Sequence, residues 1–381
     1  MNDWRTRAKR LARDLADHGV LTDPRWRAAF EAVPRHAFVP RFYGENGAIV
    51  DGGDPGQRDA WLSTVYTDST LVTQIAAVPG TELRWSTSSS TMPSLMARMF
   101  QLLDVTDDDR VLEIGTGSGY NAALLCHRLS DAQVASIDLD PELVADARRR
   151  LAALGHRPRL VAGDGAAGIP DAAPYQRIIA TCAVREVPLA WITQLAPDGL
   201  ILADVRGEIA GSLVVLRRSE SHTVGGRFLG LPGHFMWMRA EAGNPLRDAG
   251  TYRTTFSLDG ARHRATDLDP AAFDEPNLRF FLQLLVPDIE AMYRTRNHGT
   301  GVMHLRSDDG CWAEVGTTAE GERHRVTEAG TRSLWTAAER AARLWVHHGR
   351  PACTRFGLTC TVDGGQHFWL DDPSTAVELL G

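Results

Sequence analysis

Three glycines that follow an apolar stretch are the residues of this sequence most suited to chemistry. Residues 111–114 are Val-Leu-Glu-Ile, and Gly115, Gly117 and Gly119 follow, directly before an alanine-rich stretch at 121–129. Glycine lets the backbone approach a ligand closely, and the first turn of a helix offers free N–H groups at the same point. The pattern therefore predicts a strand, a nucleotide-binding turn and a helix, although an ordinary tight turn would also carry glycines.

Polar residues also end the next two predicted strands. Asp138 ends an apolar stretch at 134–138, roughly 20 residues after the glycines, where a Rossmann-like sheet places the acid that binds ribose. Gly163, Asp164 and Gly165 follow a third predicted strand at 159–162. Parallel strands end at one edge of a sheet, and open α/β sheets bind their ligands at that edge. We therefore expect these residues to form one binding site.

The acid before the first glycine indicates the class of nucleotide. Dinucleotide sites use Gly-x-Gly-x-x-Gly, whereas here Glu113 is followed by a glycine at every second position. A carboxylate at this point favours a positively charged ligand without phosphates, because opposite charges attract. S-adenosylmethionine, with its ammonium and sulfonium groups, meets this requirement, and nicotinamide cofactors do not.

Five segments together resemble the protein-L-isoaspartate O-methyltransferase family, in the same order and at similar separations: residues 33–40, 111–120, 137–142, 163–165 and 173–179. The most specific of them is the first, which contains Pro-Arg-His-Ala-Phe-Val-Pro. The resemblance covers a little over half of the chain. It implies an α/β fold, with a Rossmann-like S-adenosylmethionine-dependent methyltransferase sheet and N-terminal helices. The remaining residues then form an appended C-terminal α+β domain.

The resemblance also assigns the residues that bind the cofactor. It implies that Glu113, Gly115, Gly117 and Gly119 surround the methionine end, that Asp138 holds the ribose hydroxyls and that Asp164 faces the adenine. Their neighbours in the motifs are assigned to the same site: Thr116, Tyr120, Leu139, Gly163 and Gly165.

One segment departs from the family's pattern. Where the family carries Gly-Gln-Thr-Ile-Ser-Gln-Pro, residues 86–93 are Ser-Thr-Ser-Ser-Ser-Thr-Met-Pro. Alignment on the proline places Thr91 at the family's active-site serine and Met92 at a glutamine. Thr91, Ser90 and Ser89 are our candidate catalytic residues, because their hydroxyls can hydrogen-bond a substrate carboxylate and its backbone. The alternative is a flexible hydroxyl-rich linker.

Composition narrows the class of protein. The 381 residues include 43% hydrophobic residues and carry a net charge of −7, which argues against nucleic acid or an anionic membrane as the main partner. The N-terminal residues lack the apolar core of a signal peptide, so we expect a cytoplasmic protein. Five cysteines without Cys-x-x-C, and histidines without a His-Glu-x-x-His pattern, predict neither disulfides nor a metal site.

The local pattern predicts the elements that position these residues. We expect helices to about 18 and at 25–33, an extended segment at 34–40, a loop at 44–58, and short strands within 61–85. A helix at 94–103 then precedes the sheet. Arg35 and His36 are either catalytic or tie the extended segment to the core.

The chain divides into three predicted units: an N-terminal helical and substrate-facing segment at 1–92, the methyltransferase domain at 93–240 and the α+β domain at 241–381. The last contains predicted strands near 251–258, 301–306, 311–315, 355–362 and 366–370, and a helix at about 331–348 whose tryptophans should be core. We expect this domain to recognise the substrate or to mediate dimerisation.

The substrate is the least determined property. Over its whole length the chain resembles family variants that accompany ATP-grasp peptide maturases and lanthipeptide synthetases. This resemblance implies methylation of an aspartate side chain in a ribosomally made, cyclised peptide, followed by succinimide (aspartimide) formation. The alternative is repair of L-isoaspartyl residues in damaged proteins. A small-molecule methyltransferase or a non-catalytic partner of a maturase would use the same cofactor site.

Overall fold

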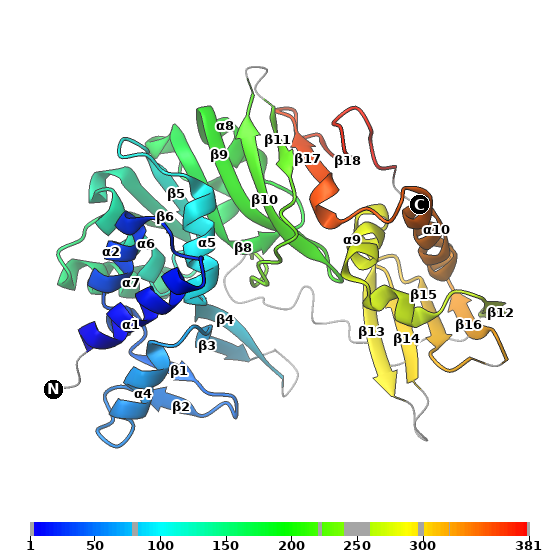
Figure 1. Cartoon of the computed structure of the whole chain (residues 1–381), viewed down its shortest axis with the longest axis horizontal. Helices are drawn as coiled ribbons and strands as arrows, with labels where there is room; N and C mark the ends of the chain where they lie inside the picture. The colour runs from blue at the N-terminus through cyan, green and yellow to red at the C-terminus, as the bar shows by residue number, and fades with distance from the viewer. Residues whose placement is uncertain are drawn as a thin grey trace.

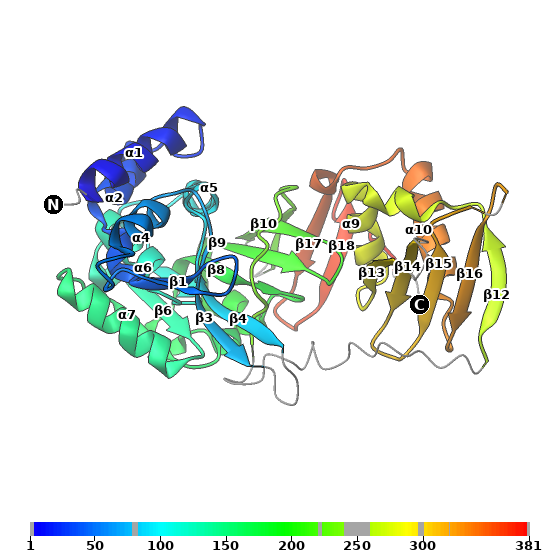
Figure 2. The same ribbon diagram turned by 90° about the horizontal axis from the view of Figure 1, so that it is seen from below.

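The computed structural model describes residues 4–77, 83–219, 223–239, 260–295, 301–319 and 321–378. Three sheets organise these residues, and the molecule is elongated, with the largest sheet between the N-terminal helices and a second, smaller sheet (Figure 1). A view from below shows the same succession along the long axis (Figure 2). None of the helices in the described ranges is long and apolar enough to cross a membrane.

The N-terminal part packs on the central sheet and carries a small sheet of its own, in the order β2-β1-β3-β4. Its elements are α1 (Trp4–Asp17), α2 (Pro24–Ala32), α3 (Arg35–Phe38), β1 (Arg41–Tyr43), β2 (Ile49–Asp51), α4 (Arg58–Val65), β3 (Leu71–Ala77) and β4 (Arg84–Ser90). Asp23 caps α2 by accepting a hydrogen bond from Arg25 N, which agrees with the helix predicted there.

Three predictions for this part were wrong. The segment predicted to be a loop at 44–58 contains the strand β2, which pairs with β1 in an antiparallel manner. The segment predicted to be extended at 34–40 contains the short helix α3, because Pro34 stands just before the helix, where its missing N–H costs nothing. The two residues that flank this helix, Pro34 and Val39, lie outside the helical region, and Val39 is the residue before Pro40. Within 61–85, the first residues form the end of α4 rather than a strand, since Trp61, Leu62 and Val65 bury one helical face.

The central sheet has nine strands in the order β18-β17-β11-β10-β9-β8-β5-β6-β7. The strands β5 to β9 are parallel, as a Rossmann-like sheet requires, and the others are antiparallel. The elements of this region are α5 (Pro93–Leu103), β5 (Val111–Ile114), α6 (Tyr120–Arg128), η1 (Asp131–Gln133), β6 (Val134–Asp138), α7 (Pro141–Ala153), β7 (Arg159–Ala162), η2 (Gly165–Ala167), η3 (Pro170–Ala172), β8 (Tyr175–Val184), α8 (Leu189–Gln194), β9 (Leu195–Arg206), β10 (Gly211–Arg218) and β11 (Val224–Arg227). The predicted fold class and the helix at 94–103 are confirmed.

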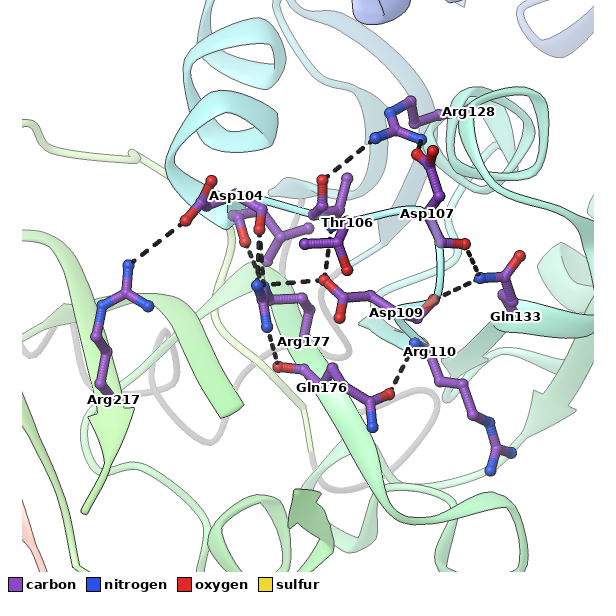
Figure 3. Close-up of polar contacts among 12 residues, drawn as sticks. Asp104, Thr106, Asp107, Asp109, Arg110, Arg128, Gln133, Gln176, Arg177 and Arg217 are labelled. Carbon is purple, nitrogen blue, oxygen red and sulfur yellow. Dashed lines mark hydrogen bonds and ion pairs between the residues drawn. The ribbon is translucent and has the colours of Figure 1, made fainter. Parts of the chain in front are cut away.

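A polar network fixes the strand ends on the side away from the glycine turn (Figure 3). Arg177, at the start of β8, donates to the carbonyl oxygens of Leu103 and Asp104 and forms an ion pair with Asp109 at 3.2 Å. These contacts tie the end of α5 to β8. Because Arg177 also pairs with Asp109, it holds the loop between α5 and β5 as well.

The second sheet has the order β12-β16-β15-β14-β13 and packs against two helices. Its elements are β12 (Arg262–Thr266), η4 (Pro270–Asp274), α9 (Pro276–Leu285), β13 (Glu290–Thr295), β14 (Gly301–Arg306), β15 (Trp312–Gly316), β16 (His324–Ala329) and α10 (Leu334–His347). The predicted helix at about 331–348 is confirmed, and Trp335 is fully buried. The strand predicted near 251–258 lies outside the described residues.

The C-terminal residues do not all belong to this second sheet. After η5 (Cys353–Arg355), β17 (Phe356–Cys360) and β18 (Gln366–Leu370) return to the central sheet, where β17 pairs with β11. One apolar core continues from Trp191 and Phe228 through Phe280 to Trp335. A boundary at 240/241 therefore does not separate everything that follows from the methyltransferase sheet, and the three-part division remains a proposal.

Candidate active site

The glycine turn has the conformation that its sequence predicts. Gly115, Gly117 and Gly119 have positive φ values of 98°, 50° and 86° between the end of β5 and the start of α6. A side chain on Gly115 would lie 2.7 Å from the Thr181 hydroxyl, and one on Gly119 would lie 2.9 Å from the Ala147 side chain. The N–H groups of these glycines are used within the fold: Gly115 N donates to Ile137 O, Gly117 N to Asp138 and Gly119 N to Thr116 O. The turn therefore offers a ligand close approach to its backbone, because no side chain projects from its glycines.

Asp138 lies at the carboxyl end of β6 and faces this turn. Its Oδ2 accepts a hydrogen bond of 2.8 Å from Gly117 N, and its Oδ1 accepts one of 3.1 Å from Asp140 N. Burial raises the pKa of Asp138, and these two hydrogen bonds oppose that shift. Each carboxylate oxygen keeps a free lone pair, so Asp138 can shape the turn and still accept hydrogen bonds from a ligand.

The hydroxyl-rich segment is not a flexible linker but the strand β4, an edge strand that pairs with β3. Ser88 and Ser90 are buried, and Ser89 and Thr91 are partly buried. A Cβ on Gly117 would lie 3.6 Å from Ser88 Oγ, which places the strand directly beside the turn. The structure thus brings the candidate catalytic hydroxyls to the predicted cofactor-binding turn.

Arg35 holds this strand in place from inside the protein. The guanidinium is fully buried and donates to the carbonyl oxygens of Val65, Thr67, Ser69, Ser90 and Thr91, and to Ser90 Oγ. Burial lowers its pKa to about 10. Of the two roles left open, the structure supports the structural one. His36 likewise contacts the Tyr66 hydroxyl at 2.8 Å, packed beside Trp61.

A cavity of about 1050 Å³ joins these parts. Ten of the predicted site residues line it: Ser89, Ser90, Thr91, Gly115, Thr116, Gly117, Tyr120, Asp138, Leu139 and Gly165. Four predicted residues do not: Glu113, Gly119, Gly163 and Asp164. Asp164 instead caps η2 by accepting a hydrogen bond from Ala166 N, and Gly119 packs against α7.

Glu113 lies beneath the turn rather than in the cavity. It is fully buried in β5, where Ser136 donates to its Oε2 at 2.6 Å, and its Oε1 has no hydrogen-bond partner among the described residues. The pKa of Glu113 is raised to about 8, mainly by burial; the Ser136 hydrogen bond opposes this shift, and the nearby Asp138 adds to it. The residue is therefore protonated at neutral pH and supports the turn from below.

This burial predicts a pH-dependent stability. The unfolded chain releases the Glu113 proton near pH ~4.3, whereas the folded protein keeps it up to about pH 8. The free energy of unfolding should therefore fall as the pH rises through this interval, by up to about 1.4 kcal/mol per pH unit from this group. Urea unfolding at several pH values should show a shallower fall for Glu113→Gln, and parallel curves for both proteins would contradict this prediction.

Sequence reasoning missed the far wall of the cavity. This wall consists of residues 231–239, which cross the carboxyl ends of β8 and β9. The guanidinium groups of Arg185 and Arg206 both contact the indole of Trp237, at 5.1 and 4.8 Å from its ring centroid. Glu290 and Arg306 of the second sheet line the same cavity. No motif marks this segment, so only contacts distant in sequence reveal it.

A family comparison matches residues 6–228 to the model of "Protein-L-isoaspartate(D-aspartate) O-methyltransferase (PCMT)". The chain belongs to this family. A protein-L-isoaspartate O-methyltransferase of Methanoregula boonei is 35% identical over 232 residues, which cover 58% of this chain and 91% of that protein. A second, from Archaeoglobus fulgidus, is 33% identical over 227 residues and is covered to 88%. The family match ends before the segment 231–239.

A solved structure with the name protein-L-isoaspartate O-methyltransferase has the same fold over nearly the whole chain. Its TM-score is 0.56 at 22% identity, with 96% of this chain and all of that chain covered. At 22% identity, this similarity shows a shared fold and nothing about function.

Membership makes this protein an S-adenosylmethionine-dependent carboxyl O-methyltransferase. The residues of the site fit that cofactor. The turn at Gly115 and Gly117 has no side chains that would fill it, and Asp138 presents an acceptor beside it. No phosphate-binding cation is needed, because the cofactor carries positive charge.

Proposed function

We propose that this enzyme methylates the α-carboxyl group of L-isoaspartyl residues in proteins or peptides. The observation that carries the proposal is the cavity itself, in which the glycine turn and the hydroxyls of Ser89, Ser90 and Thr91 share one space. The family match over 6–228 supports the substrate, since curated relatives bear that name. Ser89, Ser90 and Thr91 as catalytic residues, and Asp138 as the ribose-binding acid, are part of this proposal.

The reaction requires that the substrate carboxylate be positioned against the methyl donor, and it does not require a general base. An α-carboxyl group has a pKa of about 3.3 to 3.7 and is already ionised at neutral pH. S-adenosylmethionine supplies an electrophilic methyl group when it is bound. The hydroxyls of β4 hold the carboxylate by hydrogen bonds, and the walls of the cavity exclude water that would compete for those bonds.

After methylation, the ester can close to a succinimide without further catalysis by the enzyme. The ester is a better electrophile than the carboxylate, so the backbone nitrogen of the following residue attacks its carbonyl carbon and methanol leaves. The product is a five-membered succinimide. Hydrolysis of that ring restores an aspartyl linkage in part of the molecules, which is repair when the substrate was isoaspartyl.

A second candidate is an ordinary aspartate in a ribosomally made, cyclised peptide modified by an ATP-grasp ligase or a lanthipeptide synthetase. Met92 favours it, because it lines the cavity where the family carries glutamine. The wall at 231–239 favours it too, since it lies beyond the family match. Both features would alter which peptide backbone fits. For this substrate the same succinimide would be an end product.

Paired peptides distinguish the two candidates. We expect a linear isoaspartyl peptide to gain the mass of one methyl ester, and the aspartyl peptide of the same sequence to react at least about tenfold more slowly, because its backbone runs differently from the reacting carbon. Mass spectrometry with the purified enzyme and S-adenosylmethionine measures both rates. Methylation of the aspartyl form alone would favour the second candidate, and methylation of neither would contradict peptide carboxyl methylation.

A further inference from the structure

A thiol, an imidazole and a carboxylate converge at the end of the central sheet away from the cavity. Cys126 lies near the end of α6, Asp131 begins η1 just before β6, and His156 lies between α7 and β7. One ligand atom from each of these three side chains lies within 4.8 Å of the other two. Asp138, at the opposite end of β6, lines the cavity. The group is therefore separate from the candidate active site.

The surroundings orient this group and leave it open to solvent. His156 Nδ1 contacts Asp131 Oδ1 at 2.8 Å, and the other carboxylate oxygen accepts a hydrogen bond from Arg157 N. Ligands of metal ions are held by neighbouring hydrogen-bond partners in the same way. Cys126 is buried, whereas the side chains of Asp131 and His156 are 31% and 23% exposed. An ion can therefore reach the group from solvent and meet a buried sulfur.

The combination of ligand types favours zinc. Zn²⁺ binds sulfur, imidazole nitrogen and carboxylate oxygen, whereas Ca²⁺ and Mg²⁺ take oxygen ligands. Zinc–ligand bonds of about 2.0 to 2.3 Å place tetrahedral ligand atoms roughly 3 to 4 Å apart, so small rotations of the side chains suffice. Burial and the nearby Asp131 raise the pKa of the Cys126 thiol, so the thiol is neutral without an ion and releases one proton when the ion binds.

We propose that Cys126, Asp131 and His156 bind one zinc ion, with a water molecule as the fourth ligand. The ion replaces the hydrogen bond between the imidazole and the carboxylate. It links the end of α6 to the segments that enter β6 and β7, and so stabilises this end of the sheet. Sequence spacing predicts no metal site, because the three ligands belong to separate elements and meet only in the folded chain. The inference is independent of the proposed function.

Cobalt tests the inference, because a thiolate bound to Co²⁺ gives a charge-transfer absorption band. The full-length protein without a tag is treated with a chelator, freed of it and titrated with Co²⁺, and zinc affinity is measured by competition with a coloured chelator. We expect the band to saturate at one equivalent of Co²⁺, and zinc to displace the cobalt with a Kd below about 10 μM, since three of the four ligands of a structural site are present.

Cys126→Ala should lose the band and bind zinc at least about hundredfold more weakly, because loss of a ligand costs more than loss of a ligand's partner, which costs about 10- to 100-fold. Cys360→Ala is the matched control, since Cys360 is also buried but belongs to β17, and it should keep both properties. A band that persists in Cys126→Ala, or that Cys360→Ala also loses, would overturn the assignment.

His156→Gln provides a second variant should Cys126→Ala not fold, because His156 is partly exposed. Its affinity for zinc should fall at least about tenfold. Saturating zinc should raise the Tm of the native protein by at least about 2 °C, and the same zinc concentration should raise that of His156→Gln by less than half as much. A native protein with neither the cobalt band nor a zinc-dependent Tm would overturn the inference.

Discussion

Arg35→Ala is expected to lower the rate of methyl transfer at least about hundredfold in the molecules that remain folded. The buried guanidinium holds the carbonyl oxygens of Ser90 and Thr91, so its loss lets the end of β4 shift, and a displacement of about 1 Å can cost about 10²-fold in rate. The variant should also lose about 3 to 5 kcal/mol of stability, because several buried acceptors lose a charged donor. Urea unfolding and single-turnover rates check the two effects.

Arg177→Ala is the matched control for this variant. Arg177 is also buried and bonds carbonyl oxygens, but its network lies at the opposite ends of the strands (Figure 3). It should lose comparable stability, while the rate per folded molecule changes by less than about threefold. Equal rates for both variants, corrected for the folded fraction, would show that Arg35 does not position the hydroxyl strand. Arg35→Lys provides a milder variant should the alanine variant not fold.

Asp138→Ala is expected to weaken binding of S-adenosylmethionine by about 10- to 100-fold. The carboxylate would lose hydrogen bonds to the ribose, each contributing about 1.5 to 3 kcal/mol when one partner is charged. The substitution would also leave Gly117 N without its hydrogen-bond acceptor, so the glycine turn would be less well ordered. Isothermal calorimetry measures this affinity.

Two further variants separate these contributions. Asp138→Asn keeps an oxygen for Gly117 N and should fall between the native protein and Asp138→Ala. Asp23→Ala removes the cap of α2 far from the cavity, so it should lower stability by about 1 kcal/mol and leave the affinity unchanged. An affinity of Asp138→Ala equal to that of the native protein would remove Asp138 from the proposed cofactor site.

Much of the candidate site can be predicted from local sequence, because the conformation of the strand, the turn and the helix each depends on a few neighbouring residues. An apolar stretch, three glycines at alternate positions and an alanine-rich stretch determine a strand, a turn with positive φ values and a helix. Asp138 could be placed at the same edge since parallel strands end together. Such inferences need only local conformational preference and the topology of a parallel sheet.

Other features depend on contacts between residues far apart in sequence. Glu113 was expected around the cofactor, yet its position in a strand that is buried on both faces places it beneath the turn, a distinction that glycine spacing does not contain. A flexible linker was the alternative for the hydroxyl run, and pairing with β3 together with Arg35 makes the run a strand.

The two sides of the cavity differ in how far the sequence predicts them. The amino-acid sequence determined the family, the glycine turn and the run of hydroxyl side chains at 86–91, because these depend on residue types at short and regular spacings. Only the tertiary structure decided that residues 231–239 close the cavity, that β17 and β18 return to the central sheet, and that β4 lies beside Gly117. Edges and walls arise from pairing and packing between distant segments, and neither local propensity nor periodicity records which distant partner a segment meets.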